Sequence, residues 1–365
     1  MSNPGAPLTG SAVGLHRVLE PPGALPQAAL RLDDRPEIAP DEVRLRVEWL
    51  NLDAASLHQL TTKHAGDGAA VRREVLDIVA ARGKLQNPVT GSGGMLVGIV
   101  DEVGPRSPLR LRAGQRVATL VSLSLTPLRI TDGLARWAGR SEQIPAEGHA
   151  ILFARSIAAV LPADLPGELA MAVLDVCGAP ALTDRVVRRH VLTLPESPPG
   201  PREGGTGVTV AVLGAAGKSG SLSLVAARRA GATRTVGVVP EEREAALLRD
   251  SGLADDVAVA DARDPVAVAT VVEGALGQGA DVTVVCVDVP GCEHGAILAT
   301  AAGGTVVFFS MATSFSAAAL GAEGLAADVT MLIGNGYVPG HAELAMELLR
   351  RDPAVRRLFE HRLHR

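Results

Sequence analysis

The stretch VAVLGAAGKSGSLSLVAARRAGA, residues 210–232, decides the fold because its glycines fit two kinds of nucleotide site. Its Gly217-Lys218-Ser219 is how a nucleotide-triphosphate P-loop ends, whereas glycines at 214, 217 and 220 are typical of a dinucleotide-binding turn. A P-loop also requires a glycine where Val212 stands. The spacing therefore favours a tight strand–turn–helix of the Rossmann type, with a pyrophosphate at the helix N-terminus.

This interpretation predicts which residues of the turn contact the cofactor. The alternative is that the three glycines only permit a tight turn and hold no ligand. The predicted cofactor-binding residues of the turn are Gly214, Gly217, Lys218, Ser219 and Gly220.

The segments after the turn alternate between apolar strands and helices. Strands are predicted at residues 208–213, 233–239, 280–289 and 305–310, and DDVAVAD supplies a further short strand. Such alternation predicts a doubly wound parallel sheet, whose ligands bind at the carboxyl ends of the strands. Val287 and Ser310 stand at two of these ends and are predicted to contact the cofactor.

The first half of the chain has a different pattern. DEVRLRVEWLNLD, MLVGIVDEVG and GQRVATLV alternate polar and apolar residues, as half-buried antiparallel strands do. We therefore expect an N-terminal β-rich, barrel-like (GroES-like) catalytic domain, residues 1–180 together with 325–365. The Rossmann domain is expected at 181–324, with a Pro/Gly-rich surface loop at 192–207.

Composition excludes several classes of function. The chain of 365 residues is 47% hydrophobic, with a net charge of -5 and a pI near 6.0. No basic face predicts a nucleic-acid partner, and no apolar run reaches the length of a membrane span. The first residues lack the pattern of a signal peptide, so a cytoplasmic location is expected. The three cysteines, 177, 286 and 292, are too scattered for a disulfide framework or a zinc ribbon.

Several segments resemble the medium-chain dehydrogenase/reductase superfamily in their usual order. These are DEVRLRVEWLNLDAASL, GIVDEVGP, LRAGQRVATL, LGAAGKSG, GADVTVVCVD and AAGGTVVFFS. More narrowly, NPVTGSGGMLVG, LDVCGAPA, FFSMATSFSAAALGAEG and IGNGYVPGHAE resemble the L-erythro-3,5-diaminohexanoate dehydrogenase family of lysine fermentation. The likeness extends over nearly all of the chain from about His16 onward.

The resemblance implies an oxidative deamination. The C3 amine of 3,5-diaminohexanoate would be oxidised to an imine, which water converts to 5-amino-3-oxohexanoate and ammonia, while hydride passes to NAD or NADP. A base must take a proton from the reacting ammonium, since only the neutral amine can expel hydride. A homodimer is the expected assembly.

Three carboxylates are candidates for the base or for binding ammonium groups: Asp175, Asp53 and Glu323. For each, the alternative is a helix cap or a surface charge. Asp175 is our first choice because it lies at the expected domain junction. We expect Asp175→Asn to leave cofactor affinity nearly unchanged, because the phosphates are held by the glycine-rich turn.

Substrate binding is predicted for Lys84, Thr90 and Ser92. Lys84 could reach the substrate carboxylate, or alternatively lie solvated at a helix end. Thr90 and Ser92 could donate hydrogen bonds, or alternatively serve only the turn they belong to.

No metal site is predicted. By the resemblance, TGSGG stands where zinc-dependent relatives have Gly-His-Glu, and Cys177 lacks partners for a catalytic zinc, which needs three protein ligands.

The choice between NAD and NADP stays open. NAD-selective sites usually require an acidic residue at the end of the second Rossmann strand, and this strand does not end in one. Arg243 could accept a 2′-phosphate, which Glu241 and Glu242 would oppose. Two other functions also stay open: a zinc-free quinone or enoyl reductase, and a non-enzymatic NAD(P)-binding protein.

Overall fold

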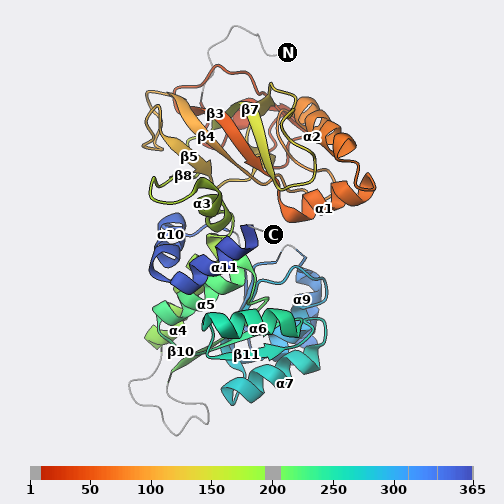
Figure 1. Cartoon of the computed structure of the whole chain (residues 1–365), viewed down its shortest axis with the longest axis vertical. Coiled ribbons are helices and arrows are strands. Elements are labelled where there is room, and N and C mark those ends of the chain that lie inside the picture. Colours follow the sequence, from red (N-terminus) through yellow and green to blue (C-terminus); the bar gives the residue numbers. More distant parts are fainter. Residues whose placement is uncertain (1–9, 194–206, 311, 335, 364–365) are drawn as a thin grey trace. The chain divides into compact units, whose positions relative to one another are not determined.

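The computed structural model describes residues 10–193, 207–310, 312–334 and 336–363 (Figure 1). The chain divides into two compact units, Met1–Leu165 and Pro166–Arg365, which we call the N-terminal and C-terminal units. Most of the predicted loop at 192–207 lies outside the described residues.

The N-terminal unit is built on an antiparallel sheet in the order β6-β7-β3-β4-β5-β8. In β3 the apolar side chains Val43, Leu45 and Val47 are buried and Arg46 between them is exposed, so one face of the strand supplies the core. The elements are η1 (Leu15–Arg17), β1 (Val18–Glu20), β2 (Arg31–Leu32), β3 (Val43–Asn51), α1 (Ala54–Lys63), α2 (Gly68–Arg82), β4 (Met95–Val103), β5 (Arg116–Thr119), η2 (Leu123–Leu125), β6 (Leu128–Ile130), β7 (Gln143–Leu152) and β8 (Ala158–Val160).

The C-terminal unit holds a parallel sheet in the order β11-β10-β9-β12-β13-β14. All six residues of β9 are buried, which is why this strand is a continuous apolar run in the sequence. The elements are α3 (Gly167–Leu174), α4 (Gly178–Thr193), β9 (Val208–Leu213), α5 (Lys218–Ala230), β10 (Ala232–Val239), α6 (Glu242–Ser251), β11 (Asp256–Val259), α7 (Pro265–Leu276), β12 (Ala280–Val285), α8 (Glu293–Leu298), β13 (Thr300–Phe308), α9 (Phe315–Gly324), β14 (Thr330–Ile333), α10 (His341–Arg351) and α11 (Pro353–Leu363).

Helices form two groups around the parallel sheet. Helices α4, α5 and α10 contact one another, and α7, α8 and α9 form a second series of contacts. Ala211 and Leu213 of β9 join the core that contains α7 and α8, whereas Val210 and Val212 alternate with them along the strand. The arrangement of this unit is the doubly wound α/β fold that the sequence predicted, and the antiparallel sheet belongs to a separate unit of the chain (Figure 1).

The two units part at a different place from the expected domain boundary at 180. Helix α3 contacts α10 and α11, so it belongs with the C-terminal unit. The segment 325–365, which we expected with the N-terminal domain, also lies in the C-terminal unit, because β14 extends the parallel sheet beside β13. A strand of four residues with mixed exposure carries little signal in the sequence.

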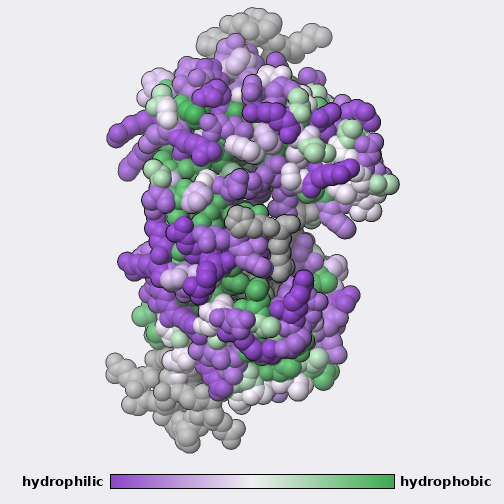
Figure 2. Space-filling model, viewed as in Figure 1, coloured by the Kyte–Doolittle hydropathy of each residue, from purple (hydrophilic) through white to green (hydrophobic). Residues whose placement is uncertain are grey.

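The surface of both units in the view of Figure 2 is mostly hydrophilic. Within the part of the chain that the structure describes, we find no helix with the length and apolar character to cross a bilayer.

Candidate active site

The turn between β9 and α5 has the geometry of a dinucleotide-binding turn. Strand β9 contains Val212 and ends at Leu213, so the loop is too short to wrap a triphosphate. Gly214 has a φ of +77°, and a Cβ there would lie 2.9 Å from the Val287 backbone nitrogen. A Cβ at Gly220 would lie 2.3 Å from the Gly214 carbonyl oxygen, so this glycine lets α5 approach the turn closely.

Gly217 differs from the other two glycines because the protein leaves space beside it. It caps α5 with a φ of -70°, and a Cβ there would meet only the Gly214 carbonyl oxygen, at 3.1 Å. Lys218 and Ser219 begin the helix and are partly exposed. Free backbone N–H groups at this helix end, beside an open glycine, suit a pyrophosphate.

A pocket of about 260 Å³ continues from this turn along the carboxyl ends of the parallel strands. Most of the residues that line it are apolar. Asp261 and Arg263, which follow β11 in the chain, also line it. Arg263 donates to Asp261 from Nε at 2.9 Å and from Nη2 at 2.7 Å, and this hydrogen bonding holds the pKa of Asp261 down at about 2. Both residues were missed from the sequence, although Asp261 ends a predicted strand and Arg263 follows it. The pocket residues are Leu213, Gly214, Val238, Val239, Pro240, Ala260, Asp261, Ala262, Arg263, Val287 and Val289.

The ends of β12 and β13 meet on the same edge of the sheet. Val287 lines the pocket, as expected of a cofactor contact. Ser310 donates a hydrogen bond of 3.1 Å to the Asp288 carboxylate, which also accepts one from the Ala312 backbone. Arg243 lies outside the pocket lining, 71% exposed, with its guanidinium 3.1 Å from the Glu241 carboxylate. The cation that could accept a 2′-phosphate is thus paired with Glu241.

Asp175 and Lys218 form an ion pair within the C-terminal unit. The Lys218 Nζ lies 3.0 Å from the Asp175 Oδ2, and the two side chains are 30% and 28% exposed. Asp175 is also the C-cap residue of α3, and its backbone N–H donates to the Met171 carbonyl. The first-choice base is therefore held beside the predicted pyrophosphate site.

In the N-terminal unit, Asp53 and Thr90 come together around Ser56. Asp53 caps α1 by accepting a 2.8 Å hydrogen bond from the Ser56 backbone through Oδ1. Its Oδ2 is buried and has no hydrogen-bond partner among the described residues. The hydroxyls of Ser56 and Thr90 lie 2.6 Å apart. Capping was the alternative we gave for Asp53, and one of its carboxylate oxygens does cap α1.

The loop that carries Thr90 and Ser92 is ordered by Asn87. The Asn87 side-chain oxygen accepts from the backbone of Val89 at 2.8 Å, and Ser92 donates its backbone N–H to the Thr90 hydroxyl at 3.3 Å. Ser56, which is fully buried, and Asn87 were missed from the sequence. The contact of Ser56 with Thr90 joins residues 34 positions apart, so the pattern near either residue did not indicate it.

Lys84 lies away from this cluster and is fully buried. Its ammonium donates to the carbonyl oxygens of Pro26, at 2.7 Å, and Gln27, at 3.3 Å. Burial, and then the charge of Arg82, lowers the pKa of Lys84 to about 8. Neither alternative from the sequence describes this position: Lys84 is not solvated, and its ammonium is occupied by backbone carbonyls.

Glu323 is exposed on α9. Cys177 is buried, which raises the pKa of its thiol to about 12. Over residues 10–193, 207–310, 312–334 and 336–363, no three His, Cys, Asp or Glu side chains are grouped as metal ligands would be.

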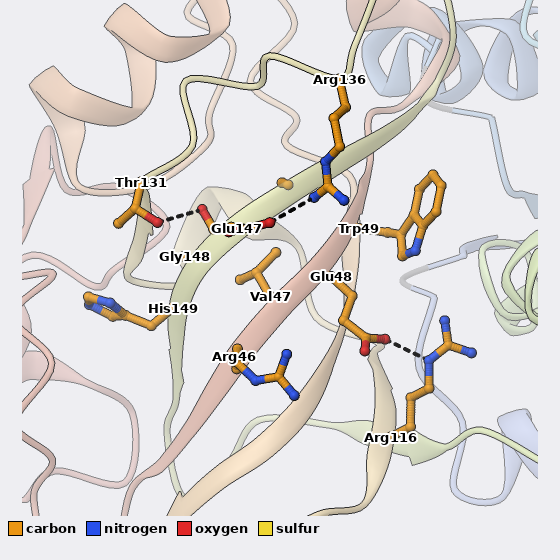
Figure 3. Close-up of a pocket in the computed structure, with 11 residues that line it drawn as sticks. Arg46, Val47, Glu48, Trp49, Arg116, Thr131, Arg136, Glu147, Gly148 and His149 are labelled. Atoms are coloured by element: carbon orange, nitrogen blue, oxygen red, sulfur yellow. Dashed lines mark hydrogen bonds and ion pairs between the residues drawn. The ribbon is translucent and has the colours of Figure 1, made fainter.

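A groove of about 760 Å³ opens on the outer face of the antiparallel sheet, and no predicted site residue lines it (Figure 3). Its walls are ion pairs: Arg116 donates to Glu48 at 2.7 Å, and the Arg136 guanidinium lies 3.4 Å from Glu147. These pairs largely balance the charge of the groove within the protein, so we assign no chemistry to it.

A doubly wound parallel sheet and a separate antiparallel sheet in one chain are a fold that solved dehydrogenase structures share. The fold is similar to that of the alcohol dehydrogenase TADH from Thermus sp. ATN1, with a TM-score of 0.51 and 18% identity over 90% of this chain and 86% of that chain. A likeness at this identity concerns the fold.

The particular family follows from closer relatives. The model of the L-erythro-3,5-diaminohexanoate dehydrogenase N-terminal domain matches residues 16–162. The enzyme of that name from Acetoanaerobium sticklandii is 43% identical over 97% of this chain and 99% of its own length. Its counterpart from Fusobacterium nucleatum subsp. nucleatum is 42% identical over 96% of this chain and 98% of its own length. The chain belongs to the L-erythro-3,5-diaminohexanoate dehydrogenase family, which confirms the resemblance.

Proposed function

We propose that this protein catalyses the nicotinamide-dependent oxidative deamination of L-erythro-3,5-diaminohexanoate to 5-amino-3-oxohexanoate and ammonia, a step of lysine fermentation. One observation carries the proposal: both units match, over nearly their whole length, relatives named for this activity. The cofactor, when bound, accepts the hydride. The relatives favour neither a quinone or enoyl reductase nor a non-enzymatic binding protein.

The cofactor fits the residues that the C-terminal unit presents. The open space at Gly217 and the N–H groups at the start of α5 suit its pyrophosphate, and the pocket beside Val239 suits its adenosine part. We further propose NAD as the preferred cofactor, because Glu241 already pairs with Arg243 and adds negative charge where a 2′-phosphate would lie. Glu241→Gln should lower the KM for NADP more than that for NAD, and equal effects on both would contradict this choice.

In the proposed reaction the substrate changes in three steps. A carboxylate first takes a proton from the C3 ammonium, giving a neutral amine. The nitrogen lone pair then forms a C=N bond as the C3 hydride leaves. Water adds to the resulting imine, and collapse of the adduct releases ammonia and leaves the ketone.

Asp175 is the residue we propose as the base, with Asp53 as the next candidate. Asp175→Asn keeps the size of the side chain but removes the charge and the base, so kcat should fall roughly a hundredfold. The loss should shrink at high pH, where more of the substrate arrives as free amine. A turnover within about threefold of the parent at neutral pH would transfer the role to Asp53.

Asp53 is proposed to bind the ammonium that does not react. Its Oδ2 is buried without a partner among the described residues, and a buried carboxylate oxygen gains from a charged donor. The hydroxyls of Ser56 and Thr90, 2.6 Å apart, and the Ser92 hydroxyl would complete the polar lining. Glu323 has less support as a catalytic group, because it is exposed on α9.

A homodimer and a cytoplasmic location also remain proposals. A dehydrogenase that exchanges its dinucleotide with the cell draws on the cytoplasmic pool. Sedimentation equilibrium tests the assembly, and fractionation of cells tests the location.

A further inference from the structure

We propose that the cofactor pyrophosphate and Asp175 compete for the ammonium of Lys218, so that cofactor binding frees the Asp175 carboxylate for the substrate. The inference rests on the proposed function, because it takes Asp175 as the group that meets the reacting ammonium. It replaces our expectation that Asp175 and cofactor affinity are independent.

The geometry places one cation between two anionic partners. Lys218 is the first residue of α5 and follows Gly217, where the backbone is open to a phosphate. Its Nζ lies 3.0 Å from the Asp175 Oδ2, which comes from the end of α3, 43 residues earlier in the chain. Both helices belong to the C-terminal unit and can be followed in Figure 1. The Lys218 side chain is 30% exposed, so its ammonium can turn on the flexible stem without opening the core.

The charges determine the direction of the exchange. Without cofactor, the carboxylate is the partner that Lys218 has. A pyrophosphate adds two negative charges at a helix end that already attracts anions, so it draws the ammonium toward itself. The Asp175 carboxylate is then left close to negative charge and without its cation. An ammonium of the substrate can take the vacated place, and no proton has to move during this exchange of partners.

Cofactor binding should therefore strengthen binding of the diamino acid. By reciprocity, the diamino acid should strengthen cofactor binding to the same degree. Lys218 acts here as a positioning residue, since it controls when the carboxylate is available and does not touch the reacting atoms.

The test is a double-mutant cycle on the dissociation constant of NAD, measured by isothermal titration calorimetry without substrate. Asp175→Asn removes the competitor and should tighten NAD binding roughly threefold, the scale of a partly exposed ion pair. Lys218→Met should weaken binding by a similar or larger factor. The double variant should bind NAD as Lys218→Met does, because Asp175 acts through Lys218.

A matched control comes from the other end of the same helix. Arg229 of α5 pairs with Glu347 at 2.7 Å, and the two side chains are 35% and 32% exposed. Glu347→Gln breaks a pair of similar length and exposure away from the turn and should leave the NAD dissociation constant unchanged. Melting temperatures of all variants check folding, and Lys218→Gln replaces Lys218→Met if the latter does not fold.

Two results would overturn the inference. Asp175→Asn could leave NAD affinity unchanged, or it could tighten binding by the same factor in the Lys218→Met background, which would indicate simple repulsion between Asp175 and the phosphates. Turnover of the diamino acid is measured separately. If the double-mutant cycle gives the expected NAD affinities but Asp175→Asn turns over the diamino acid at the parent rate, Asp175 is not the base. The competition between Asp175 and the pyrophosphate for Lys218 would still hold.

Discussion

Replacing two glycines of the cofactor turn by alanine, one at a time, should impair different properties of the protein: stability in one variant and cofactor binding in the other. A Cβ at Gly220 would lie 2.3 Å from the Gly214 carbonyl oxygen and 2.7 Å from the Ala215 Cα, and both are backbone atoms. A Cβ at Gly217 would have only the Gly214 carbonyl oxygen near it, at 3.1 Å. The protein therefore resists a methyl group at Gly220, whereas at Gly217 the obstructed partner would be the cofactor.

The magnitudes follow from these distances. Overpacking costs roughly 1–3 kcal/mol, and each kcal/mol lowers the melting temperature of a unit of this size by roughly 2–4 °C. Gly220→Ala should thus lower the melting temperature by roughly 2–12 °C. Gly217→Ala should melt within about 2 °C of the parent, yet bind NAD at least about tenfold more weakly, a loss of about 1.4 kcal/mol.

Differential scanning fluorimetry and calorimetric titration with NAD measure the two effects. Gly274 of α7 provides the control, since a Cβ there meets nothing within 4 Å. Gly274→Ala should leave NAD affinity unchanged and should not lower the melting temperature. Parental NAD affinity in Gly217→Ala, or a parental melting temperature in Gly220→Ala, would refute the assignment of roles in the turn.

Three further predictions concern the acid stability, the thiols and the substrate site. Burial raises the pKa of Glu42, but hydrogen bonds from His16 and Arg17 outweigh it and lower the pKa from 4.5 to about 2. The contribution of the Glu42 carboxylate to the free energy of unfolding is therefore complete above pH 4.5 and is lost as the pH falls toward 2. In urea titrations at pH 5, 4 and 3, the free energy of unfolding should decline less steeply for Glu42→Gln than for the parent. Burial raises the thiol pKa to about 12 in Cys177, about 12 in Cys286 and about 11 in Cys292. A thiol reagent at pH 8 should therefore label the native protein slowly and should label all three cysteines once urea unfolds it. Fast labelling of the native protein would contradict this. Asp53→Asn should raise the KM for the diamino acid roughly tenfold with NAD affinity unchanged, and an unchanged KM would exclude Asp53 from substrate binding.

The sequence was most informative where local chemistry determines structure. The apolar run of β9 and the glycines of the turn each depend on near neighbours, and the predicted α/β alternation was confirmed. Strand β14 was missed because its assignment depends on pairing with β13 rather than on its own pattern.

Long-range contacts account for the site residues that were placed differently. Lys84 finds its carbonyl partners 58 and 57 residues away, and no pattern around Lys84 indicates them. The Asp175–Lys218 pair joins the end of one helix to the start of another, so the sequence located both residues but not their contact. Asp261 and Arg263 lie only two residues apart, yet their place in the pocket depends on the neighbouring strands.

The central claim is the oxidative deamination itself, and one assay measures both of its products. Purified protein is mixed with L-erythro-3,5-diaminohexanoate and NAD at mildly alkaline pH, and reduced nicotinamide and ammonia are followed together. We predict that both are formed in equal amounts, and that Gly217→Ala slows both alike at subsaturating NAD. Reduction of the cofactor without release of ammonia, or no reduction at all, would contradict the account.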